Sequence, residues 1–101
     1  MIIEYVRYQV PLKEAKEFLS AVDRAQAALA EAPECRAWEM ARGVEDPTRW
    51  VIRIEWESLD AHQAGFRTGP NYTDYMRPLR RYHEYLVDSD HYKTNDVQAR
   101  K

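Results

Sequence analysis

The alternation of large apolar and polar side chains over residues 49–57 is the strongest constraint on the fold of this chain. One parity carries Trp50, Ile52, Ile54 and Trp56, whereas the other carries Val51, Arg53, Glu55 and Glu57. A period of two is typical of a strand with one apolar and one polar face. Because two tryptophans on one face need a substantial cover, we expect a central strand with helices packed against its tryptophan face.

The rest of the chain predicts further strands at residues 2–10, 35–44 and 85–93 and an amphipathic helix over residues 12–31. A second helical region is expected to start at Leu59, with Ser58 as its N-cap, to break at Gly69-Pro70 and to resume with Asn71 as a new N-cap. Pro78 is expected to kink or divide this last helix. The order strand, helix, strand, strand, helix, strand predicts an α+β, ferredoxin-like fold, in which an antiparallel four-stranded sheet carries both helices on one face.

Composition limits the class of protein. The 101 residues allow one domain, which we place at residues 1–93, followed by a flexible tail over residues 94–101. The net charge of −2 comes from scattered charges, so neither a nucleic-acid footprint nor a membrane-binding face is expected. The single cysteine, Cys35, excludes an internal disulfide. No signal peptide or membrane span is indicated, and we expect a cytoplasmic protein.

The sheet face opposite the tryptophans is expected to be half apolar. Its predicted apolar members are Ile3, Tyr5, Ala37, Ala41 and Val51. An open face of this kind is a site of association, and two copies can bury it about a two-fold axis. The sequence therefore predicts a homodimer.

The segment that leaves the tryptophan strand carries a family resemblance. Ile54-Glu55-Trp56-Glu57-Ser58 runs into Leu59-Asp60-Ala61-His62-Gln63-Ala64-Gly65-Phe66-Arg67, and an aromatic follows at Tyr72. This pattern resembles the antibiotic biosynthesis monooxygenase (ABM) family. The resemblance implies a ferredoxin-like subunit that dimerises into an α/β barrel, with a pocket between sheet and helices. It also implies relatives that include cofactor-independent oxygenases of phenols and quinols, haem-degrading enzymes and proteins without known activity.

Two departures from the family pattern affect the site. Many members carry a His where this chain has Gly65, while His62 lies one turn earlier. The first strand has no Asn of the kind that the haem-degrading branch uses, so haem degradation is disfavoured.

His62 is the candidate general base, because its ordinary pKa is near neutrality and its spacing from Leu59 and Phe66 turns it toward the sheet. The residues expected to bind a flat aromatic substrate are Trp38, Trp56, Phe66, Asn71, Tyr72 and His91. No cofactor is expected. A metal site made from His62, His83 and His91 is an alternative that no known motif spacing supports.

Two functions stay open at this point. The first is a cofactor-independent monooxygenase that acts on a quinol, catechol or polyketide-like phenol. The second is a non-catalytic dimeric α/β-barrel protein of the stress-responsive type, which binds a hydrophobic small molecule. A catalytic pocket should present His62 to a ligand, whereas a structural His62 should donate to a backbone carbonyl in a space filled with side chains.

Overall fold

The computed structural model describes residues 1–101, which form four strands, two α-helices and three short helical segments. The strands are β1 (Ile2–Gln9), β2 (Cys35–Arg42), β3 (Arg49–Trp56) and β4 (Leu86–Lys93), and the α-helices are α1 (Ala15–Glu31) and α2 (Pro70–Leu79). Two 3₁₀ segments, η1 (Leu12–Glu14) and η3 (Arg80–Tyr85), adjoin the α-helices, and the π-helical turn η2 (Ala61–Phe66) follows β3.

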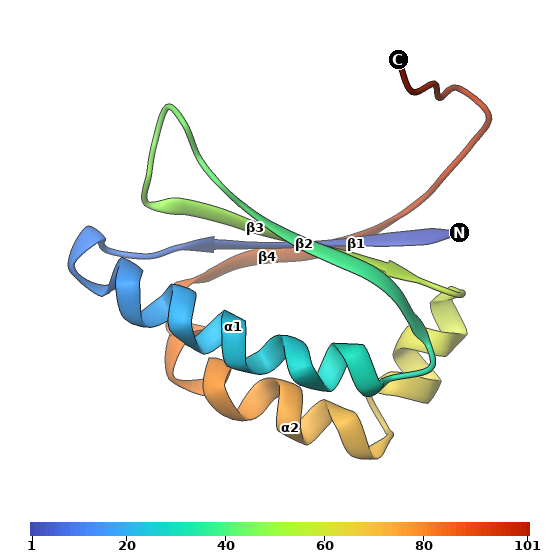
Figure 1. Ribbon diagram of the computed structural model, residues 1–101, viewed down its shortest axis with the longest axis horizontal. Coiled ribbons are helices and arrows are strands. Elements are labelled where there is room, and N and C mark those ends of the chain that lie inside the picture. The colour runs from blue at the N-terminus through green and yellow to red at the C-terminus, as the bar shows by residue number, and fades with distance from the viewer.

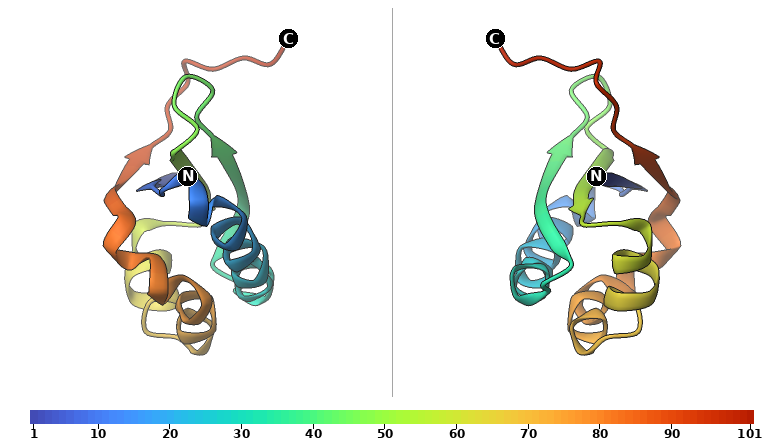
Figure 2. Two further views of the ribbon diagram at one scale, coloured as in Figure 1. Left: turned by 90° about the vertical axis from the view of Figure 1, so that its left-hand side faces the viewer. Right: turned by 90° about the vertical axis from the view of Figure 1, so that its right-hand side faces the viewer.

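The sheet is antiparallel with the strand order β2-β3-β1-β4, so the tryptophan strand β3 is central as predicted. Figure 1 shows both α-helices under the same face of this sheet, and the end views in Figure 2 show the helices side by side. The predicted ferredoxin-like α+β fold is therefore confirmed. None of the helices combines the length and the apolar composition needed to cross a bilayer.

The register of β1 decides which side chains face the helices. Ile2 lies opposite Trp56 and Tyr8 lies opposite Trp50, so the same parity of both central strands points under the helices. On the other side of β1, Glu4 lies opposite His91 of β4. Glu4 and His91 are therefore neighbours on the helix-covered face.

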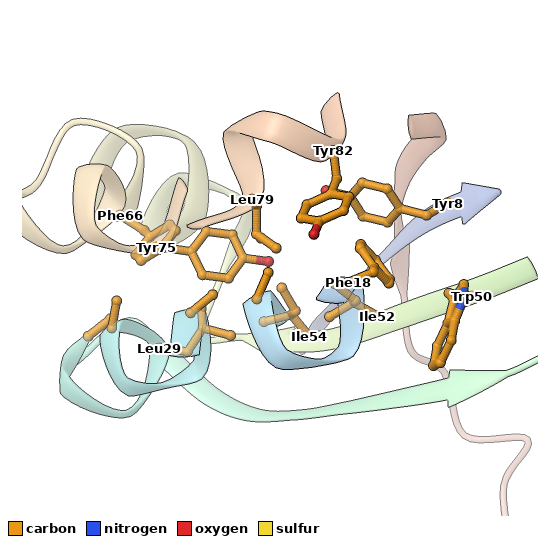
Figure 3. Close-up of a cluster of buried hydrophobic side chains, with 14 of the residues drawn as sticks. Tyr8, Phe18, Leu29, Trp50, Ile52, Ile54, Phe66, Tyr75, Leu79 and Tyr82 are labelled. Carbon is orange, nitrogen blue, oxygen red and sulfur yellow. The ribbon is translucent and has the colours of Figure 1, made fainter. Parts of the chain in front are cut away.

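An aromatic cluster fills the space between sheet and helices at one end. The Phe18 ring of α1 lies 5.0 Å from the ring of Tyr8, 5.6 Å from Trp50 and 5.3 Å from Tyr82. Figure 3 shows these rings beside the aliphatic side chains that continue the core, which include Leu29, Ile52, Ile54 and Leu79. Phe18 is completely buried and so links α1, β1, β3 and η3.

The helix boundaries after β3 differ from the prediction in one respect. Ser58 caps the turn as expected, because its Oγ accepts from the Ala61 N–H at 3.0 Å. Asn71, however, is not an N-cap: Gly69 takes that position and Pro70 begins α2. Pro suits the first turn because its missing N–H has no intrahelical acceptor there. Pro78 stands one residue before the end of α2, where the chain tightens into η3, so the expected division occurs.

The face of the sheet away from the helices combines aromatic and charged side chains. Tyr5 packs edge-on against Tyr92 at 5.5 Å between ring centroids, and Arg7 forms ion pairs with Asp88 and Asp90. Val51 is half-buried on this face. The chain after β4 runs away from the helices, as Figures 1 and 2 show.

Replacing Phe18 by Ala should destabilise the fold by about 3–5 kcal/mol, because the truncation leaves a cavity among three aromatic rings. The neighbouring variant Leu19→Ala is the matched control, since Leu19 is 49% exposed and its loss should cost well under half as much. Urea unfolding followed by circular dichroism measures both. Equal losses in the two variants would contradict this account of the core.

Candidate functional site

Three polar side chains from three separate elements meet at one end of the helix-covered face. They are Glu4 of β1, His62 of η2 and His91 of β4, and they offer ligand atoms that all lie within 4.8 Å of one another. Glu4 and His62 are the two polar residues that are buried in the fold, at 8% and 5% exposure. Burying polar groups is costly unless they find partners. In this cluster, Glu4, His62 and His91 mainly serve as partners for one another.

The indole of Trp56 holds this cluster in place. Its Nε1 donates to Glu4 Oε1 at 3.0 Å, and its ring stacks on the His62 imidazole at 4.3 Å between centroids, with 16° between the planes. Trp56 is fully buried, so both contacts are shielded from water. The position and the plane of the His62 ring are thus fixed from the sheet.

Both ring nitrogens of His62 face side chains. Nε2 lies 3.5 Å from Glu4 Oε1, and Nδ1 lies 2.7 Å from His91 Nε2. Two imidazole nitrogens at that distance share one hydrogen, so one ring donates and the other accepts. The His62 ring therefore contacts side chains through both nitrogens, and the expected bond to a backbone carbonyl is not present.

The environment disfavours charge on both buried groups. Burial, together with smaller effects of the charges of His91 and Arg67, lowers the pKa of His62 to about 4. Burial also raises the pKa of Glu4, against the opposing effects of the Trp56 hydrogen bond and the charges of His91 and Arg67. Perturbed groups that face each other in a cleft are candidates for function. His62 is therefore neutral and keeps a lone pair, but it is a weaker base than the near-neutral pKa used in the sequence analysis predicts.

The cluster forms one wall of a cavity of about 140 Å³ between the sheet, η2 and α2. The aromatic side chains that line the cavity are Tyr8, Trp56, Phe66, Tyr72 and Tyr75. Its polar lining consists of Glu4, His62, Arg67, His83, Ser89 and His91. Ring-to-ring contacts continue through this wall, because Phe66 lies 4.8 Å from Trp56 and 5.7 Å from Tyr72.

The structure brings most of the sequence-predicted site residues together. His62, Trp56, Phe66, Tyr72 and His91 all line this cavity. Trp38 does not: it lies in a separate cavity of about 210 Å³ between α1 and the sheet, where its Nε1 donates to Gln26 Oε1 at 3.0 Å. Asn71 is half-buried in the first turn of α2 and is not part of the lining.

Glu4 is the site residue that the sequence analysis did not single out. It stands on a parity of the first strand whose other members, Ile2, Val6 and Tyr8, face the helices. A lone acid among apolar residues on a covered face is a usable signal. Arg67 and Ser89 carried no such signal, because the fold alone brings them to the cavity.

Several solved structures, among them candidate antibiotic biosynthesis monooxygenases, have the same fold as this chain. A candidate antibiotic biosynthesis monooxygenase from Bordetella bronchiseptica is 21% identical and superposes with a TM-score of 0.77 over 93% of this chain and 96% of its own. One from Deinococcus radiodurans is 14% identical, with a TM-score of 0.76 over 100% of this chain and 99% of its own. SnoaB from Streptomyces nogalater, a cofactor-independent oxygenase, is 18% identical, with a TM-score of 0.72 over 97% and 94%. Among curated proteins, no sequence match was found.

These structural similarities, at such low identity, establish the fold alone. The family model for antibiotic biosynthesis monooxygenases, by contrast, matches residues 1–78. This range includes β1, α1, β2, β3 and all but the last residue of α2. The matched segment also contains Glu4, Trp56 and His62. The chain therefore belongs to the antibiotic biosynthesis monooxygenase (ABM) family.

Proposed function

We propose that this protein is a cofactor-independent monooxygenase that acts on a phenolic substrate, a quinol or a catechol, bound in the cavity beside His62. The observation that carries this proposal is a buried histidine that faces Glu4 and His91 in an aromatic-walled cavity. Family membership and the activity of SnoaB support it.

The proposed reaction begins when the substrate hydroxyl gives its proton to the His62–His91 pair. The resulting phenolate is electron-rich enough to reduce dioxygen, and a bond forms between a ring carbon and oxygen. The base returns its proton to the outer peroxide oxygen, which gives a hydroperoxide. The base then removes the hydrogen from the same ring carbon while the O–O bond breaks, so a carbonyl forms and the departing hydroxide takes that proton and leaves as water. One oxygen atom stays in the product, and the substrate supplies all the electrons.

His62 is placed for this role by its neighbours. Stacking on Trp56 fixes its plane, and Glu4 can hold the hydrogen of Nε2. Nδ1 then carries the lone pair toward His91, whose half-buried ring lies nearer the solvent. Water is kept from the reacting carbon by Phe66, Tyr72 and Tyr75.

The cavity volume favours a small substrate within this class. About 140 Å³ is close to the roughly 150 Å³ that accommodates benzene in a protein interior. A single-ring quinol or catechol fits this space, whereas a polycyclic phenol of the polyketide type would extend beyond it.

The non-catalytic alternative also needs a cavity, because it binds a small molecule. Only a purely structural role of His62 predicts a space filled with side chains and a backbone partner for the ring. The cavity beside His62 and the side-chain partners of both its nitrogens argue against that arrangement. Ligand binding without turnover is the result that would favour the non-catalytic alternative.

His62→Gln should lower substrate-dependent oxygen uptake by about 10²–10⁴-fold, because removal of a positioned general base typically has that effect. The assay is an oxygen electrode with single-ring quinols and catechols. Trp38→Phe, in the separate cavity, is the control and should keep the wild-type rate. Uptake that persists undiminished in His62→Gln would refute the base role.

The neutrality of His62 can be tested without any substrate. In the folded protein its pKa is about 4, against 6.5 ordinarily, so between these pH values the unfolded chain binds more protons. The free energy of unfolding contributed by this group therefore falls as pH falls, by about 2 kcal/mol from pH 7 to pH 5. Glu4 acts in the opposite sense, because its raised pKa stabilises the folded state as pH falls.

Comparison with His62→Gln separates the two effects, since Glu4, His91 and Arg67 face the site in both proteins. The pH-dependent loss of stability between pH 7 and pH 5 should be smaller in the variant by about 2 kcal/mol. Urea unfolding at the two pH values measures it. Identical pH dependence in both proteins would mean that His62 titrates normally.

We also propose that two copies pack through the open faces of their sheets to form a homodimer. Half-buried Tyr5, Ala37 and Val51 give that face an apolar component. Light scattering during gel filtration should give twice the chain mass of 12.0 kDa. Val51→Asp should shift the protein to the monomer mass, whereas Val44→Asp, on the 91% exposed loop position, should not. A monomeric wild type would refute the dimer.

A further inference from the structure

We infer that Glu4, His62 and His91 form a binding site for one divalent transition-metal ion. Each residue contributes one ligand atom, and the remaining coordination positions face the cavity. This inference goes beyond the proposed oxygenase activity and does not depend on it.

The spacing of the three groups is close to that of a coordination sphere. Zinc lies about 2.0–2.2 Å from nitrogen and oxygen ligands, so two ligand atoms on one ion are at most about 4.2–4.4 Å apart. The three ligand atoms lie within 4.8 Å of one another, and His62 Nδ1 is already 2.7 Å from His91 Nε2. Binding an ion therefore requires the three side chains to shift, because the largest separation exceeds this limit by about 0.4–0.6 Å.

The donor set determines the kind of ion. Two imidazoles and one carboxylate suit zinc, cobalt, nickel or iron(II), and protein ligands on one side leave other positions open. Calcium and magnesium prefer oxygen ligands throughout, so neither is expected here. The open positions would be taken by water or by an oxygen of a ligand in the cavity.

The surroundings already orient the three ligands. Trp56 Nε1 donates to Glu4 Oε1, the oxygen that lies 3.5 Å from His62 Nε2, and the same indole stacks on His62. Glu4 and His91 lie opposite each other on hydrogen-bonded strands, so the backbone fixes their separation. Outer groups that orient metal ligands in this way strengthen binding.

One charge opposes the ion. Arg67 lines the same cavity, but its side chain is exposed and reaches over the Tyr72 ring, with 5.8 Å to the ring centroid. An exposed guanidinium is well screened by solvent, so it weakens binding without preventing it. Its position also suits an anionic ligand atom at an open coordination position.

The ion and the proposed base compete for the same lone pairs. A metal on His62 and His91 removes the acceptor that the oxygenase reaction needs. Bound zinc should therefore inhibit any cofactor-independent turnover, while metal binding itself is measurable whether or not turnover exists. Failure of one proposal is thus distinguishable from failure of the other.

The test is a titration of the full, chelator-treated chain with Co²⁺, followed by visible absorption, because the d–d bands report the ligand set. Wild type should saturate at one ion per chain. Glu4→Gln keeps an acceptor for Trp56 but loses the carboxylate, and it should weaken binding at least tenfold. His91→Ala should weaken it further.

His83→Gln is the matched control, because His83 lies in the same cavity outside the three-residue cluster. It should bind Co²⁺ as wild type does. Absence of saturable binding, an unaffected Glu4→Gln variant, or an equal loss in His83→Gln would each overturn the site.

A measurement on the wild-type chain avoids the risk that a variant misfolds. Paramagnetic Co²⁺ should shift the imidazole proton resonances of His62 and His91 far more than those of His83. Shifts of similar size on all three rings, or on His83 alone, would place the ion elsewhere and overturn the inference.

Discussion

The pairing of β1 with both β3 and β4 is the constraint on which the rest of this structure depends. It places Tyr8 opposite Trp50 and Glu4 opposite His91, all on the face that the helices cover. A shift of β1 by one residue would turn Tyr8 and Glu4 to the other face, away from Trp50 and His91. The aromatic core and the polar site are therefore two ends of a single register, one apolar and one lined by titratable groups.

Trp56 joins those two ends. As a fully buried side chain it contributes to the core, and through its indole N–H and its ring face it also binds Glu4 and stacks on His62. A phenylalanine at this position could stack but could not donate to a carboxylate. This pairing explains how a buried acid and a buried imidazole persist side by side at a point where hydrophobic packing alone would be more stable.

The sequence was sufficient for the fold and for much of the site wall. Alternation in the tryptophan strand and the apolar stripe of the first helix are local patterns, and His62 with Phe66 follows from helical spacing. The places of Glu4, Trp38 and Asn71 could not be predicted from local sequence patterns. The meaning of Glu4 depends on which strands flank it, the place of Trp38 depends on how far α1 extends over the sheet edge, and Asn71 lost the cap to Gly69 because Pro70 fits the first helical turn. These are properties of tertiary pairing that no single segment carries.

The π-helical turn has a further consequence for how this protein can change over time. The Arg67 N–H donates to the His62 carbonyl five residues back, so the turn holds one residue more than an α-helical turn would. Substitutions within it leave the phase of His62 and Phe66 intact. Loss of a single residue would restore α-helical phase and rotate one ring away from Trp56. In this segment we expect descendants of this chain to keep the length of the turn as well as the identity of His62.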